Sequence, residues 1–203
     1  MATRRKIKKD IFIWFKLAIL IIIIIGIYDF LFINHNHIDE FQTSKISIQH
    51  HFLTVNPYSR PGKSLKNVNG VVVHYTGNPG SSAKNNRNYF ESLKNTHVTK
   101  ASSHFIIGIN GEIIQCIPLN EISYASNNRN SDTISIECCH PDSSGRFTNA
   151  TYQSLQILVK ELMNTYHLNK NDIIRHYDVT HKQCPKYYVK YPQKWRDFIN
   201  SLE

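Results

Sequence analysis

Residues 173–185 read Ile-Ile-Arg-His-Tyr-Asp-Val-Thr-His-Lys-Gln-Cys-Pro. The short β-branched run predicts a strand that ends at His176. The loop after it can bring Cys184 back to the same neighbourhood, with Pro185 stiffening its exit. Imidazole and thiolate are both zinc ligands, and a loop of this length can bring them to one ion. The stretch therefore supplies two of the ligands that a metal site needs.

A third candidate ligand stands about a hundred residues upstream, at the end of another strand-like run. There Val71-Val72-Val73 leads directly to His74. Two histidines, one cysteine and an open fourth position are typical of a catalytic zinc, because a structural site fills all four positions with protein ligands. Spacing alone leaves a second interpretation open, in which the histidines are strand-end polar residues and Cys184 is a small buried thiol.

Two other uses of these residue types are disfavoured. Blue copper sites commonly add a weak axial methionine, but the chain has only Met1 and Met163, at the terminus and inside an expected helix. Cys184 could instead be the nucleophile of a cysteine peptidase with a histidine base. A loop before proline, however, lacks the helix N-terminus that usually activates such a thiol.

Residues 1–33 differ sharply in composition from the rest of the chain, which has 203 residues and a formal charge of +9. Residues 11–33 are almost wholly apolar, with Lys16 and Asp29 near the two ends, and can cross a bilayer as a helix. Residues 1–10 form a basic cytoplasmic segment with Arg4, Arg5, Lys6, Lys8 and Lys9 against Asp10. Much of the positive charge therefore lies beside the expected membrane span, and no nucleic-acid partner is expected.

The basic flank predicts a single-pass protein of the cell membrane, with everything after about residue 34 extracytoplasmic. A cleaved signal peptide is the alternative, but residues 32–38 show no small-x-small cleavage pattern. Residues 34–66, rich in asparagine and histidine, are expected to be a solvated spacer and the approach to the domain rather than a second metal site. Residues 67–203 are expected to form the domain itself.

Strand and helix signals alternate through this domain. Strands are expected at residues 68–75, 102–109, 112–117, 133–139 and 173–175. Asn110-Gly111 between two apolar runs predicts a hairpin. Helices are expected from Ser81 or Ser82 to about Leu93, and at residues 148–168 and 193–202. The pattern predicts a single α/β domain with a central mixed β-sheet packed by helices, preceded by one transmembrane helix.

Four motifs follow one another in an order that resembles a known family. His74-Tyr75-Thr76 follows an apolar strand, Ser103-His104-Phe105-Ile106-Ile107 precedes the Asn-Gly turn, and Ser135-Ile136-Glu137 lies in a later strand. His176-Tyr177-Asp178 is then followed by Lys182-Gln183-Cys184-Pro185. Together they resemble the type-2 zinc-dependent N-acetylmuramoyl-L-alanine amidases, relatives of phage amidase lysozymes and peptidoglycan-recognition proteins. The resemblance covers roughly residues 67–190.

The resemblance implies Zn²⁺ held by His74, His176 and Cys184. It also implies peptidoglycan as the partner, and hydrolysis of the amide between the lactyl group of N-acetylmuramic acid and L-alanine. The main alternative is a recognition module that binds muropeptide without cutting it. Such members typically lose a ligand, most often the cysteine, whereas this chain keeps all three.

Carried over by position, Glu137 matches the carboxylate that handles the attacking water in many members, and Lys182 matches a cation beside the metal. Both roles suit amide hydrolysis, which needs a general base and a positive group near the developing oxyanion. Some relatives carry a tyrosine immediately before the histidine of the second motif, but this chain has Ser103 there. The expected acid/base residue is therefore Glu137.

Several further residues are candidates for contacts to muropeptide, with ordinary core or surface roles as the alternative: Tyr75, Asn78, Arg87, His104 and Tyr124. His104 is expected to be structural or substrate-facing, and not a ligand.

The remaining histidines and cysteines have simpler expected roles. His140 and His181 are expected to be exposed. Cys116 could form a disulfide with either Cys138 or Cys139 outside the cell, but not with both, because adjacent strand residues point to opposite faces.

Overall fold

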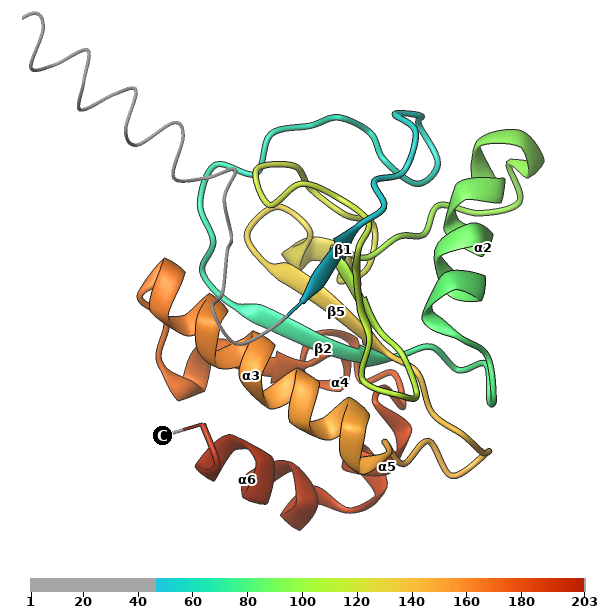
Figure 1. Ribbon diagram of the computed structural model, residues 1–203. Coiled ribbons are helices and arrows are strands. Elements are labelled where there is room, and N and C mark those ends of the chain that lie inside the picture. Colours follow the sequence, from blue (N-terminus) through green and yellow to red (C-terminus); the bar gives the residue numbers. More distant parts are fainter. Residues whose placement is uncertain (1–46, 203) are drawn as a thin grey trace, which may run out of the picture. The chain divides into compact units, whose positions relative to one another are not determined.

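The computed structural model describes residues 47–202, and its centre is a six-stranded mixed sheet in the order β1-β4-β3-β5-β2-β6 (Figure 1). The strands are β1 (Ile48–His50), β2 (Val71–Tyr75), β3 (Phe105–Ile107), β4 (Ile113–Gln115), β5 (Ile134–Cys138) and β6 (Ile173–Arg175). Neighbouring strands are parallel except in the β3–β4 hairpin around the Asn-Gly turn. β2 and β5 are rich in apolar residues and mostly buried, as expected for strands covered on both faces.

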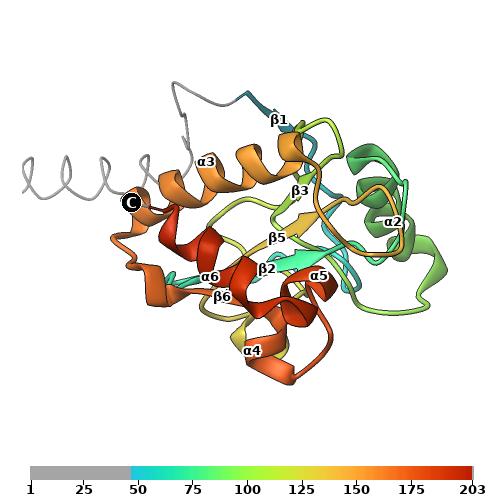
Figure 2. The same cartoon turned by 90° about the horizontal axis from the view of Figure 1, so that it is seen from below.

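Helices cover both faces of this sheet. The helices are α2 (Ala83–Thr96), α3 (Asn149–Tyr166), α4 (His176–Thr180), α5 (Lys186–Lys190) and α6 (Pro192–Asn200), with 3-10 turns η1 (Asn127–Arg129) and η2 (Lys170–Asp172). Phe90 and Leu93 of α2 share a buried cluster with Ile106 and Ile114. Figures 1 and 2 show α3 and α6 side by side across the other face. The predicted α/β domain with a mixed sheet packed by helices is confirmed.

The two long helices begin where the sequence predicts. The Ser82 hydroxyl accepts a hydrogen bond from the backbone N–H of Asn85, and the Thr148 hydroxyl accepts one from Thr151. These contacts satisfy N–H groups that have no partner inside the helix. Each helix ends one turn past its last buried leucine, at a histidine in the left-handed conformation.

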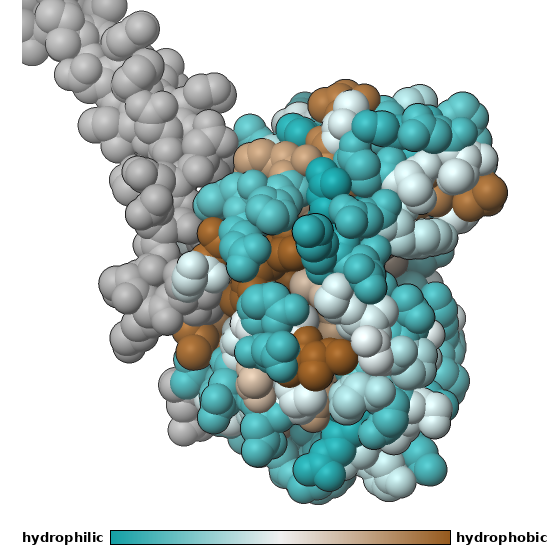
Figure 3. All heavy atoms as spheres, turned by 45° about the vertical axis from the view of Figure 1, so that its right-hand side comes forward, coloured by the Kyte–Doolittle hydropathy of each residue, from teal (hydrophilic) through white to brown (hydrophobic). Residues whose placement is uncertain are grey.

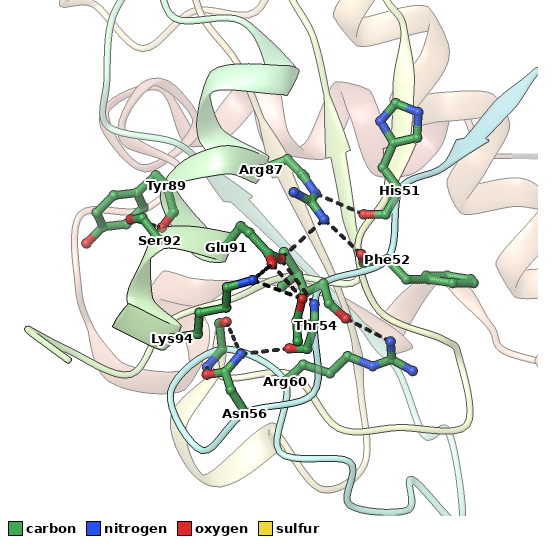
Figure 4. A network of polar contacts seen from close by, with 12 residues as sticks. His51, Phe52, Thr54, Asn56, Arg60, Arg87, Tyr89, Glu91, Ser92 and Lys94 are labelled. Atoms are coloured by element: carbon green, nitrogen blue, oxygen red, sulfur yellow. Dashed lines mark hydrogen bonds and ion pairs between the residues drawn. The ribbon is translucent and has the colours of Figure 1, made fainter. Parts of the chain in front are cut away.

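Part of the expected spacer belongs to the domain, so the predicted boundary at residue 67 is wrong. β1 pairs in parallel with β4, and Leu53 is only 1% exposed. Arg60 makes two hydrogen bonds to the carboxylate of Glu121, of 2.8 and 2.6 Å. Figure 4 shows residues of this segment meeting α2 through a network of polar side chains. Contacts of this kind join residues far apart in sequence and leave no local periodic pattern.

Three smaller expectations also need comment. His140 is buried, with 1% exposure, so its predicted exposure is wrong: Tyr75 packs against its ring, at 5.1 Å between ring centroids. His181 is exposed as predicted. All four cysteines are free, so Cys116 forms no disulfide with Cys138 or Cys139.

The expected basic segment 1–10 and membrane span 11–33 lie outside the described residues. Between residues 47 and 202, no helix is long and apolar enough to cross a bilayer. Figure 3 shows one face of the molecule, largely hydrophilic, with hydrophobic residues in a few separate patches. The large hydrophobic side chains with the most exposure are Phe52, Val55, Tyr89, Val98 and Tyr191.

Candidate metal centre

The sheet brings His74 and His176 together at the ends of two paired strands. β2 and β6 run parallel, with Val73 opposite Arg175. The residue that follows each of these two is a histidine, so both histidines lie at the carboxyl ends of their strands, at the same edge of the sheet. The two imidazole rings lie 4.6 Å apart between centroids. His176 is the first residue of α4, although the sequence predicted a loop there. A helix of five residues is too short to show apolar periodicity, which explains the miss.

Cys184 returns to these histidines after α4. Its carbonyl accepts a hydrogen bond of 2.8 Å from the backbone N–H of Tyr177, which closes the loop. Its Sγ lies 3.8 Å from Nδ1 of His74. One ligand atom from each of His74, His176 and Cys184 lies within 4.8 Å of the others. The three predicted ligands therefore form one cluster.

Two residues that the sequence did not single out fix the orientation of the imidazoles. Nε2 of His74 lies 3.1 Å from the hydroxyl of Ser126, and Nε2 of His176 lies 3.0 Å from the amide oxygen of Asn127. When Nε2–H donates to these oxygens, Nδ1 of each ring is left with a free lone pair. Ser126 and Asn127 lie 52 and 49 residues from the histidines they contact, so spacing gave no signal for them.

The protonation of the cluster suits a cation. Burial, with the neighbouring His176 and Lys182, holds the pKa of His74 well below its usual value, and burial also lowers the pKa of His176. Both rings are thus neutral, the form that binds metals. Burial, with the nearby charge of Glu137, raises the pKa of the Cys184 thiol to about 12. A bound cation would compensate the thiolate charge. Two imidazoles and a thiolate fit zinc better than a hard cation, which prefers oxygen ligands.

Glu137 lies on the strand next to His74. β5 pairs in parallel with β2, and Glu137 is the register partner of His74. The carboxylate oxygen Oε2 of Glu137 is buried and has no hydrogen-bond partner within residues 47–202. Burial raises the pKa of this carboxyl to about 8, against the opposing effect of Lys182. A buried carboxyl group whose pKa lies near neutrality can both accept and donate a proton.

These groups share one cavity of about 640 Å³. Its walls include the three candidate ligands, Glu137 and Lys182, together with Tyr75 and Tyr124. The structure therefore brings seven of the ten predicted site residues to one opening. An open cavity of this size leaves room for a peptide-like substrate beside the metal ligands.

The other three predicted residues, Asn78, Arg87 and His104, are not in the cavity wall. Asn78 is exposed on the turn after β2. Arg87 points from α2 toward the N-terminal segment, where it donates to the carbonyls of His51 and Phe52 at 3.0 and 2.8 Å (Figure 4). Arg87 therefore supports the framework in this structure.

His104 is fully buried between β5 and the chain before η1. Its Nδ1 accepts a 3.0 Å hydrogen bond from the backbone N–H of Ser135, and its Nε2 donates to the carbonyl of Glu121 at 2.9 Å. Burial lowers the pKa of His104 to about 4, which keeps the ring neutral. Of its two expected roles, the structure shows the structural one.

The fold and the site together define an α/β domain with two histidines and a cysteine that could hold a metal ion, beside a buried glutamate. A sequence profile of N-acetylmuramoyl-L-alanine amidases matches residues 64–187. The chain belongs to this family.

Similar proteins are consistent with this assignment. The chain is 35% identical over 173 residues to N-acetylmuramoyl-L-alanine amidase BlyA of Bacillus subtilis, covering 75% of this chain and 46% of that protein. It is 37% identical over 170 residues to the amidase CwlL of Bacillus licheniformis, covering 78% and 47%. The chain thus spans about half the length of the curated relatives it matches. The catalytic domain of XlyA superimposes with a TM-score of 0.65 at 26% identity, covering 78% of this chain and all of that domain.

Proposed function

We propose that this protein is a zinc-dependent N-acetylmuramoyl-L-alanine amidase that hydrolyses the amide between N-acetylmuramic acid and L-alanine in peptidoglycan, for cell-wall remodelling or lysis. The observation that carries the proposal is the cluster of His74, His176 and Cys184, with ligand atoms within 4.8 Å of one another. Beside it lies Glu137, whose buried Oε2 has no hydrogen-bond partner among the described residues. We also propose that residues 11–33 anchor the protein in the cell membrane with this domain outside. The support for the anchor is the sequence pattern alone.

Zinc held by the three ligands would polarise the scissile carbonyl and lower the pKa of a bound water. Glu137 takes the proton from the attacking water and gives it to the leaving nitrogen, so that one carboxyl group serves both half-steps. Its buried Oε2 makes no competing hydrogen bond with another described residue, so it is available for this transfer. Lys182, in the wall of the same cavity, places a positive charge near the carbonyl oxygen as negative charge develops there. Ser126 and Asn127 hold the imidazoles in place throughout.

The two alternative functions fit the structure less well. A binding module without catalysis would not need Glu137 unpartnered beside a complete ligand set. A cysteine peptidase would need a thiolate at neutral pH, whereas burial raises the pKa of Cys184 to about 12.

Turbidity loss of purified cell walls tests the proposal. Chelation should abolish lysis and added zinc should restore it, because the metal supplies the activated water. Cys184→Ser should lose both zinc and lysis. Lysis that survives complete metal removal and disappears on thiol alkylation would support the cysteine peptidase and overturn the metal-dependent mechanism.

A further inference from the structure

A second hollow of about 240 Å³ lies among the start of α3, α5 and α6, and no residue lines both this hollow and the cavity at the metal centre. Its lining includes aromatic, amide and charged side chains: Arg146, Asn149, Tyr152, Tyr187, Lys194 and Asp197. Figures 1 and 2 both show α5 and α6 next to each other. We call this feature the tyrosine hollow.

The rings of the tyrosine hollow are held firmly in place. Tyr188 and Phe147 are both 5% exposed and pack at 5.1 Å between ring centroids. Tyr187 is half-buried and contacts the ring of Tyr188 at 5.5 Å. Tyr152 packs edge-on against the buried Phe198. A preformed aromatic surface can stack on the apolar face of a sugar without losing much side-chain entropy.

Charged side chains flank these rings. Arg146 is exposed, and its Cζ lies 5.9 Å from the ring centre of Tyr187. Lys194 pairs with Asp197 at 3.3 Å, but Arg146 has no ion pair within the described part of the chain. Hydrogen bonds from a neighbouring serine and, more weakly, the charge of Arg146 lower the pKa of Asp142, but the side chains of Arg146 and Asp142 form no ion pair. An exposed guanidinium group beside an aromatic face can bind a carboxylate on a ligand.

The tyrosine hollow is physically connected to the metal centre. α5 begins two residues after the ligand Cys184. The loop that carries Arg146 is wedged between Tyr75 and α5 at Gly145. A Cβ added there would lie 3.1 Å from Lys186 Cβ and 3.2 Å from the ring of Tyr75. Gly145 also has φ 73°, which favours glycine. The Gly145 loop therefore contacts both Tyr75 in the wall of the metal-centre cavity and the first residue of α5, which carries Tyr187.

We propose that the tyrosine hollow is a subsite for the glycan strand, and that it binds an N-acetylated sugar bearing a free carboxylate. The inference rests on the proposed function. In amide hydrolysis, water adds hydroxyl to the lactyl carbonyl carbon and hydrogen to the alanine nitrogen as the C–N bond breaks. The sugar is left with a new carboxylate. Arg146 would bind this carboxylate while Tyr187 stacks on the sugar ring. The tyrosine hollow would then hold the part of the glycan strand from which the peptide has been removed.

Binding of two soluble tetrasaccharides to the zinc-loaded full chain in neutral detergent tests this subsite by calorimetry. One is the peptide-free strand of alternating N-acetylglucosamine and N-acetylmuramic acid, and the other is the N-acetylglucosamine tetramer, which lacks carboxylates. The wild type should bind the carboxylated strand about tenfold more tightly, the contribution of one charge-assisted pair. Arg146→Gln should remove this preference, and Tyr187→Ala should weaken binding of both at least tenfold.

Matched controls separate the hollow from general effects of charge and fold. Tyr187→Phe keeps the ring and should bind like the wild type. Tyr89→Ala on α2 and Arg196→Gln on α6 remove an exposed tyrosine and an exposed arginine outside the hollow, and should change nothing. Zinc content reports whether each variant has folded. If the wild type binds neither saccharide, or if Arg146→Gln keeps the preference, the subsite is overturned.

Turnover of a small soluble muropeptide, measured in parallel, separates this proposal from the proposed function. Hydrolysis without saccharide binding would reject the subsite and leave the amidase standing. Saccharide binding that depends on Arg146 and Tyr187, without any hydrolysis, would reject the amidase and leave the glycan site standing.

Discussion

Replacing Glu137 by glutamine should change how the stability of the metal-free domain depends on pH. Burial raises the pKa of Glu137 from its ordinary 4.5 to about 8 in the folded protein. The folded state therefore favours the protonated carboxyl. This contribution to stability is fully present below pH 4.5, and it is lost as the pH rises through about 8. Glutamine stays neutral at every pH and has no such dependence.

The size of the effect follows from the two pKa values. Each pKa unit between the folded and the unfolded state corresponds to about 1.4 kcal/mol in the free energy of unfolding. Most of the range between the two pKa values lies between pH 5 and pH 8. The wild type should therefore lose about 3 to 4 kcal/mol more than Glu137→Gln over this interval. The comparison removes any constant cost of burying the amide, because that cost is the same at both pH values.

Urea unfolding of both proteins in the presence of a chelator, at pH 5 and at pH 8, measures this difference. Relative to the wild type, the variant should be more stable at pH 8 than at pH 5. Equal pH dependence of the two proteins would show that Glu137 is well solvated or already paired. The argument for an unpartnered buried carboxyl beside the metal ligands would then fail.

Three further predictions concern the centre and the domain boundary. Glu137→Gln should keep zinc but lose about two to four orders of magnitude in muropeptide turnover, because a general base is removed. Turnover and zinc content are measured on the same sample, and a loss below tenfold would assign proton transfer to another group. Asn127→Ala should weaken zinc binding about 10- to 100-fold in a competition titration with a chromophoric chelator, since the ring of His176 loses its hydrogen-bond partner. An unchanged affinity would contradict that role. Leu53→Ala should lower the free energy of unfolding in urea by about 2 to 5 kcal/mol, because Leu53 is 1% exposed in the core. A change near zero would show that residues 47–66 are a spacer and not part of the domain.

The elements that the sequence predicted well are those with a local signal. Apolar periodicity marks α3, and the Asn-Gly turn marks the β3–β4 hairpin. The three candidate ligands were found in the sequence because each lies next to a strand or in a motif of fixed order. Parallel pairing of β2 with β6 then makes His74 and His176 neighbours, although they are about a hundred residues apart.

The elements that were missed depend on contacts between distant residues. β1 is a short edge strand with one half-buried residue, and Arg60 and Arg87 hold its segment through long-range contacts. Ser126 and Asn127 contact the histidines from the start of the short 3-10 turn η1, which the sequence does not indicate. His104 looked like a site residue because of its motif. Its role is decided by Ser135 and Glu121, which the fold places on either side of its ring.

The chemistry of the cut is the central claim, and one digest tests it. Purified peptidoglycan should be incubated with the zinc-loaded protein, and new amino termini and new reducing sugar ends should be counted on the same sample. The account predicts one new L-alanine amino terminus for each new lactyl carboxylate, with no new reducing ends. New reducing ends, or amino termini on any other residue, would show that a different bond is cleaved and would contradict the account.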